Sequence, residues 1–83
     1  MNGDTFLEII GMLISIEKDD SVPKGIRVRI KGAINSLNNK EISVNIRVDK
    51  SLEDLGALAE DPNVPDYART QILSLVSLLE SRE

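Results

Sequence analysis

The chain has 83 residues and a formal net charge of −4, with 41% hydrophobic and 29% charged residues. This composition is ordinary for a globular protein, and the length allows one small helical domain, residues 1–83, with a single core. Cysteine, histidine and tryptophan are absent, which excludes disulfides, thiolate zinc sites, histidine-based catalysis and most aromatic platforms for single-stranded nucleic acid.

The hydropathy pattern contains no membrane-spanning stretch. The longest apolar-rich run, residues 6–16, is too short to cross a bilayer and is interrupted by Glu8. Nothing near Met1 has the basic and apolar regions of a secretory signal. We therefore expect a soluble, cytoplasmic protein.

The first predicted element is a helix over residues 4–18, where Thr5 and Glu8 have the spacing of a capping box. Apolar residues cover more than half of its circumference, although a bundle helix normally needs a narrower stripe. The helix is therefore either contacted on two sides within the protein, or it turns part of its surface, including Leu7 and Met12, towards a second chain.

The second element, residues 26–34, has an ambiguous pattern, IRVRIKGAI. Apolar and basic residues alternate as in a half-buried strand, but Ile26, Ile30, Ala33 and Ile34 also share one face of a helix. The segment ISVNIRV, residues 42–48, alternates in the same way. A β-hairpin of residues 26–31 with residues 42–48 is therefore an alternative to two helices.

An internal repeat favours the helices. Val22-Pro23 and Val64-Pro65 lie 42 residues apart, and at that shift residues 5–41 align with residues 47–83, with eight identities in 37 positions. Roughly two or three identities are expected from average composition. The counterpart of the ambiguous segment is ARTQILSLV, which lacks alternation and is typical of a helix. A period near 42 residues is the length of a helical-hairpin repeat.

The remaining boundaries follow from turn and cap residues. The second helix is expected to begin with Pro23 at its first position and to end near Asn38, and the third to run over residues 41–60. The fourth is expected to begin at Pro65 and to continue to about residue 81. The sequence thus predicts an all-α protein, an antiparallel up-and-down bundle of four helices built from two repeated hairpins.

Each half carries the pattern Asp-x-x-Val-Pro-x-x-x-Arg, once over residues 19–27 (DDSVPKGIR) and once over residues 61–69 (DPNVPDYAR). A short acidic chain with these two elements resembles an archaeal group known as uncharacterised protein family 0147. The resemblance covers nearly the whole chain and implies an all-helical, up-and-down four-helix bundle. Because the group has no assigned activity, the resemblance assigns no catalytic residue.

The repeated Asp–Arg pairs are the first candidate site. We favour a structural interpretation, in which Asp19 and Asp61 cap turns while Arg27 and Arg69 fold back onto carbonyl groups at a helix end. The alternative is a polar recognition patch at the end of the bundle where both turns lie. The nearby carboxylates could also be imagined as a Mg²⁺ site, but no inward-facing ligand pattern supports one, and we expect no metal or cofactor.

A basic stripe and exposed apolar residues are the other candidates. Lys24, Arg27 and Lys31 share one side of the second helix and are either a solvated face or a docking stripe for RNA or an acidic protein. Leu7, Met12 and Leu73 lie outside the narrow core faces expected of their helices. We therefore expect a non-enzymatic module that binds a protein partner or its own copy. The alternatives are an RNA- or ribosome-associated accessory protein and, with least support, an enzyme that uses carboxylates alone.

Overall fold

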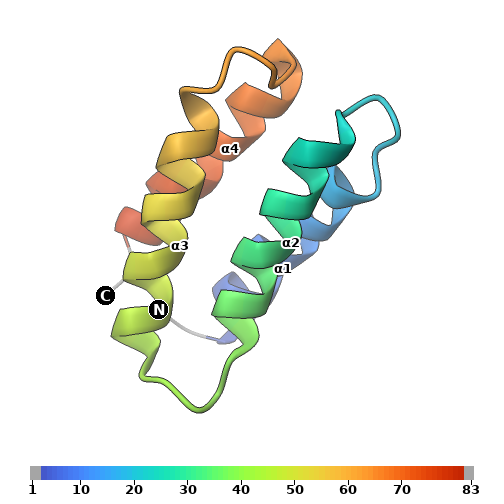
Figure 1. The fold of residues 1–83 in the computed structure, drawn as a ribbon. Helices are drawn as coiled ribbons and strands as arrows, with labels where there is room; N and C mark the ends of the chain where they lie inside the picture. The colour runs from blue at the N-terminus through green and yellow to red at the C-terminus, as the bar shows by residue number, and fades with distance from the viewer. Residues whose placement is uncertain (1–2, 82–83) are drawn as a thin grey trace.

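The computed structural model describes residues 3–81, and it contains four α-helices and no strand over that range. The helices are α1 (Gly3–Glu17), α2 (Lys24–Asn38), α3 (Val44–Ala59) and α4 (Asp66–Glu80). They run alternately up and down, so the α1–α2 and α3–α4 loops lie at one end of the molecule and the α2–α3 loop at the other (Figure 1). The predicted all-α bundle is confirmed, whereas the 42-residue repeat stays a prediction from the sequence.

Each helix packs against two neighbours. Helix α2 lies between α1 and α3, α4 packs against α3, and α1 and α4 make the least extensive contact. The buried apolar side chains form one cluster to which all four helices contribute. Two loop residues, Val22 and Val64, are buried in the same cluster. Within the described part of the chain one buried residue is polar: Ser51 of α3 is fully buried, and its hydroxyl has no hydrogen-bond partner.

Both ambiguous segments are helical, which rejects the β-hairpin. The helical face predicted for the second segment, with Ile26, Ile30 and Ala33, is buried in the core. Val28, which the strand pattern would place beside Ile26 and Ile30, is 61% exposed. Burial of the helical face therefore outweighs the modest helix propensity of these β-branched residues.

Three predicted details of the helix starts were wrong. Pro23 and Pro65 precede their helices as N-cap residues with extended backbone (ψ 144° and 148°), rather than occupying the first helical position. Helix α3 begins at Val44 and not at residue 41, because the Ser43 hydroxyl accepts a hydrogen bond from the Ile46 N–H (3.3 Å) and caps it there. Thr5 lies inside α1, whose described part begins at Gly3, so it is not the residue that precedes the helix.

Candidate functional site

The three loops between the helices share one local structure. In each, a side-chain oxygen accepts the backbone N–H two residues further on, which is an Asx turn. The acceptors are Asp19 (2.9 Å, from Ser21), Asn39 (3.1 Å, from Glu41) and Asp61 (2.8 Å, from Asn63). These turns reverse the chain through local hydrogen bonds.

An arginine four residues after each N-cap folds back over the loop. Arg27 Nε donates to the Val22 carbonyl at 3.0 Å, and Arg27 also lies 3.8 Å from Asp20. Arg69 Nε donates to the Ala59 carbonyl (2.9 Å), and its Nη2 donates to the Asp61 carbonyl (2.7 Å). Both arginines thus fold back onto backbone carbonyls, but only Arg69 reaches one at a helix end, at the last residue of α3, whereas Arg27 meets a carbonyl of the α1–α2 loop.

Sequence reasoning missed a third arginine of this kind. Arg47 donates from Nε to the Ile42 carbonyl (3.0 Å) and from Nη1 to the Leu37 carbonyl (3.2 Å). Its guanidinium carbon also lies 6.0 Å from the centre of the Phe6 ring. A signal was present, because residues 39–47 (NKEISVNIR) repeat the loop pattern with Asn for Asp, Ile for Val and Ser for Pro.

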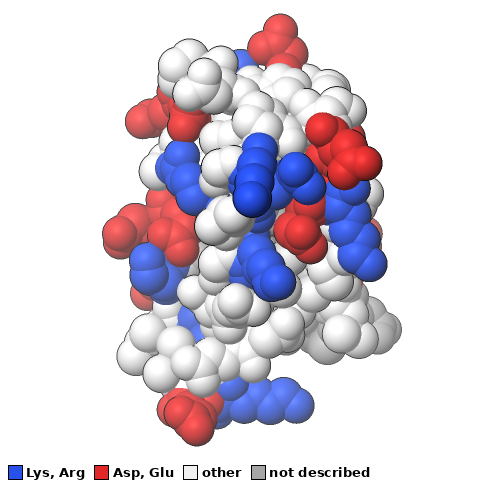
Figure 2. Space-filling view, turned by 45° about the vertical axis from the view of Figure 1, so that its right-hand side comes forward, with Lys and Arg blue, Asp and Glu red and all other residues white. Residues whose placement is uncertain are grey.

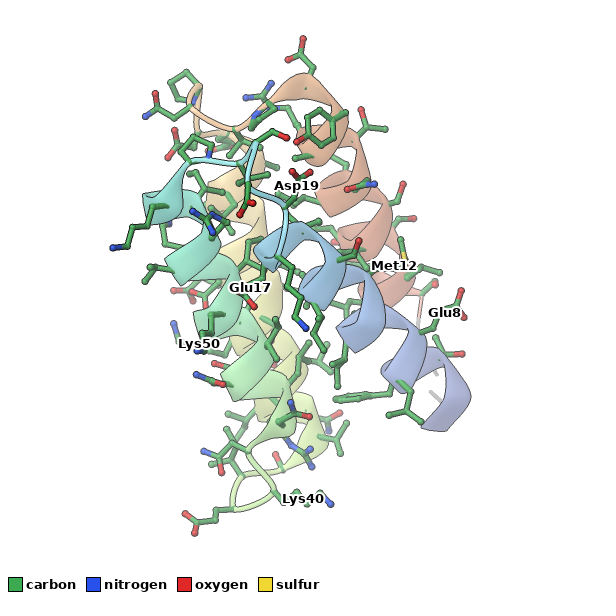
Figure 3. All side chains as sticks on the ribbon, turned by 90° about the vertical axis from the view of Figure 1, so that its right-hand side faces the viewer. Glu8, Met12, Glu17, Asp19, Lys40 and Lys50 are labelled. Atoms are coloured by element: carbon green, nitrogen blue, oxygen red, sulfur yellow. The ribbon has the colours of Figure 1, made fainter. Side chains whose placement is uncertain are left out.

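Two side-chain contacts join the α1–α2 hairpin to the α3–α4 hairpin at the end where their loops meet. The Tyr67 hydroxyl donates to Asp19 Oδ2 (2.8 Å), and Arg29 Nη1 donates to Asp61 Oδ2 (2.8 Å). Figure 3 shows Asp19 at this end of the molecule. Hydrogen bonds from the hydroxyls of Ser21 and Tyr67 hold the pKa of Asp19 below its usual value. The Asn63 N–H, with help from Arg29, lowers the pKa of Asp61.

Arg29 also lies between two shallow hollows along the α2–α3 boundary. One has a volume of about 300 Å³ and is lined by the start of α2 and by the α3–α4 loop. The other, of about 240 Å³, is lined by Arg29, Gly32, Asp54 and Ala57. Because Arg29 is paired with Asp61 and Asp54 is paired with Lys50 (3.0 Å), this groove presents no unpaired charge from these residues.

The outer surface of the α1–α2 hairpin has a different character. Arg29 reaches the α3–α4 loop, so Lys31, about 200° further round α2, faces the α1 side. Met12 points towards α4 (Figure 3), so Ile14, by the same argument, lies on the α2 side of α1. We call this surface the α1–α2 face, and its residues are Leu7, Ile14, Lys24, Val28 and Lys31.

The α1–α2 face combines exposed apolar side chains with basic side chains. Leu7 is 68% exposed, Val28 61% and Ile14 36%. Lys24 and Lys31 are exposed and form no ion pair within the part of the chain that the structure describes. Figure 2 shows basic side chains near the middle of this side of the molecule, with acidic side chains beside them.

The structure brings only some of the predicted residues together. Lys24, Lys31 and Leu7 share the α1–α2 face, while the guanidinium groups of Arg27 and Arg69 are engaged at the loops. Met12 is half-buried against the core. Leu73 is 51% exposed on α4, on a different side of the bundle. Val28 was missed as a surface residue, because its alternation with arginine resembles a strand.

Among residues 3–81, no three Asp, Glu, His or Cys side chains gather in a group that could hold a metal ion. No helix of this part of the chain is long and apolar enough to cross a membrane.

The fold and its surfaces define a compact four-helix bundle with short, arginine-braced loops. The chain belongs to the uncharacterised protein family UPF0147, whose family model matches residues 1–81. The resemblance stated from the loop elements is thereby confirmed.

Relatives from archaea carry the same family name. The UPF0147 protein of Thermoplasma volcanium is 31% identical over 81 residues, which cover 98% of this chain and 91% of the relative. The UPF0147 protein of Methanothermobacter thermautotrophicus is 33% identical over 81 residues, which cover 98% of this chain and 79% of the relative.

Two solved structures have the same fold. The crystal structure of a protein of unknown function, MMP1188, is similar with a TM-score of 0.93 and 36% identity, over 100% of this chain and 94% of that one. The crystal structure of a UPF0147 protein from Thermoplasma acidophilum has a TM-score of 0.89 and 31% identity, over 94% and 92% of the two chains.

Proposed function

We propose that this protein is a non-enzymatic interaction module that binds a protein partner through the α1–α2 face. The observation that carries the proposal is the exposure of Leu7, Ile14 and Val28 beside two lysines that lack ion-pair partners in residues 3–81. Burying one such apolar side chain fully contributes about 1.5–3 kcal/mol. Binding at this face would bury apolar surface that stays exposed in the folded protein, and this burial would stabilise the complex.

The charge of the face favours an acidic partner. Lys24 and Lys31 are seven residues apart, which places them about 10.5 Å apart along one side of α2. Leu7 and Ile14 have the same spacing on α1. A partner helix with acidic and apolar residues at seven-residue intervals fits both rows, and opposite charges at the rim favour encounter and register.

Two observations support a non-enzymatic role. The sequence lacks histidine and cysteine, which are the commonest general base and thiol nucleophile. The pKa values of Asp19 and Asp61 are lowered, so these carboxyl groups stay ionised at neutral pH. A carboxyl that acts as a general acid needs the opposite shift.

The test is capture of partners from native lysate by the tagged protein and by two variants. Val28→Glu places a negative charge on the α1–α2 face and is expected to remove the partners that the wild type captures. Ser77→Glu introduces the same charge at an exposed position of α4 and serves as the matched control. Far-UV circular dichroism and melting temperature establish that each variant is folded. Equal capture by both variants contradicts the proposal.

An RNA-associated role is the second candidate, because α2 carries four basic residues and no acidic one. However, Arg27 and Arg29 are engaged by a loop carbonyl and by Asp61, which leaves two lysines for phosphate contacts. The same capture experiment, repeated after nuclease treatment, separates the two. Loss of the captured proteins with nuclease and at raised salt would favour RNA.

A further inference from the structure

The outer side of α3 is partly apolar and carries three carboxylates; Lys50 lies on the same side and is paired with Asp54 at 3.0 Å. This side carries Ile46, Asp49, Glu53, Ala57 and Glu60 (at the end of the helix), which we call the α3 face. All five residues are exposed, and Ile46 is 57% exposed. They recur at intervals of three, four or seven residues, so they follow one side of the helix. Its three carboxylates form no ion pair within the described part of the chain.

The α3 face matches the α1–α2 face in both charge and spacing. Glu53 and Glu60 are seven residues apart, as are Lys24 and Lys31, so each pair spans about 10.5 Å along its helix. Ile46 supplies an apolar side chain for the surface around Leu7. The α1–α2 face fits a helix that has acidic and apolar residues at seven-residue intervals. Helix α3 of the same chain has this pattern on its outer side.

We infer that the α1–α2 face of one molecule binds the α3 face of a second copy. This inference rests on the proposed function, because it assigns the occupant of the same face. Within one molecule the two faces cannot meet, since α2 and α3 pack side by side (Figure 1) and the residues of each face lie on the exposed side of their helices. At an ionic strength of about 0.1 M, charges beyond roughly 10 Å are largely screened. Screening therefore weakens the overall repulsion between two molecules of net charge −4 more than it weakens the attraction between charges that face each other closely.

The geometry of such an assembly follows from the use of two different faces. An interface between unlike surfaces of identical chains is heterologous, and each added copy leaves one face of each kind free. Assembly therefore continues into a ring or an open chain, in contrast to a two-fold dimer, which stops at two. The pairs that hold it are Lys24 and Lys31 of one copy with Glu53 and Glu60 of the next.

Sedimentation velocity tests the inference. The wild type is expected to exceed its monomer mass of 9.2 kDa as its concentration rises from about 10 μM to 1 mM in 0.1 M salt. The apparent dissociation constant is expected to rise about tenfold or more in 1 M salt. A wild type that stays monomeric at 1 mM overturns self-association. It leaves the proposed function standing if Val28→Glu still loses a foreign partner that Ser77→Glu retains.

Two charge-reversed variants test which faces meet. Lys24→Glu with Lys31→Glu disables the α1–α2 face, and Glu53→Lys with Glu60→Lys disables the α3 face. Each is expected to be monomeric alone, whereas an equimolar mixture is expected to assemble again with the two variants alternating, because the intact faces pair with each other and the two reversed faces are complementary as well. A mixture that stays monomeric, or a variant that still assembles alone, overturns the assignment. If a reversed variant is unfolded, the neutral pairs Lys24→Gln with Lys31→Gln and Glu53→Gln with Glu60→Gln replace it.

Discussion

Replacing Arg69 with alanine is expected to destabilise the fold more than the same change at Arg27 or Arg47. Arg69 donates two short hydrogen bonds to backbone carbonyls, one at the end of α3 (2.9 Å) and one in the α3–α4 loop (2.7 Å), and its side chain is 28% exposed. A hydrogen bond to a charged group contributes about 1.5–3 kcal/mol when buried. Partial access of water reduces this, so we expect a loss of about 2–3 kcal/mol for the pair. The ion pair with the fully exposed Asp66 adds little.

The other loop arginines set the scale for comparison. Arg47 makes two carbonyl contacts, one of them longer at 3.2 Å, and lies against Phe6. Arg47→Ala is therefore expected to lower the free energy of unfolding by about 2 kcal/mol. Arg27 makes one carbonyl contact and a 3.8 Å ion pair with a fully exposed aspartate, so about 1 kcal/mol is expected.

Urea denaturation followed by far-UV circular dichroism measures this order. In a domain of this size, 1 kcal/mol corresponds to roughly 4–8 °C in melting temperature, so the three variants are well separated. Arg69→Lys is the control, since it keeps the charge but loses the planar fork of donors and should recover only part of the loss. Equal losses at the three positions, or a loss below about 1 kcal/mol for Arg69→Ala, would refute the reasoning.

Ser51→Ala is expected to leave the free energy of unfolding unchanged or to raise it by up to about 1 kcal/mol, because the buried hydroxyl has no partner; a clear loss in urea denaturation would show that the hydroxyl is satisfied. Gly32→Ala is expected to raise it by about 0.5–1 kcal/mol, since an added Cβ has no neighbour within 4 Å, and a lowered melting temperature would contradict this. The pKa values of Asp19 and Asp61 are lower in the folded state than their unfolded value of about 3.9, so the stabilisation is present above that pH and is lost as the pH falls further. Asp19→Asn and Asp61→Asn are therefore expected to flatten the dependence of stability on pH below about 4, and an unchanged acid profile would refute the assignment.

Helix order and the core could be predicted because they depend on local periodicity. Ile26, Ile30 and Ala33 fall on one helical face in the sequence, and the same face is buried in the structure. The start of α3 was placed three residues too early because apolar alternation continues through the loop. The start of α3 is fixed by the N-cap residue Ser43, which occupies the position of Pro23 and Pro65 in the other two loops. Serine is a weaker signal than proline in a sequence, although it fixes the boundary equally well in the structure.

The candidate surface could be predicted only in part, because a run of charge does not say which neighbour each residue faces. Arg29 and Lys31 are two residues apart, yet helical geometry sends them to opposite sides of α2. Arg29 pairs with Asp61, which lies far away in the sequence. Arg27 donates to the Val22 carbonyl in the loop before its helix, a contact that helical periodicity does not predict. Lys24 and Lys31 meet none in the described chain. The basic run therefore divides into two arginines that contact the loops and two lysines that form no ion pair in the described chain. This division makes the lysines, rather than the arginines, the residues whose reversal should change binding while the melting temperature stays the same.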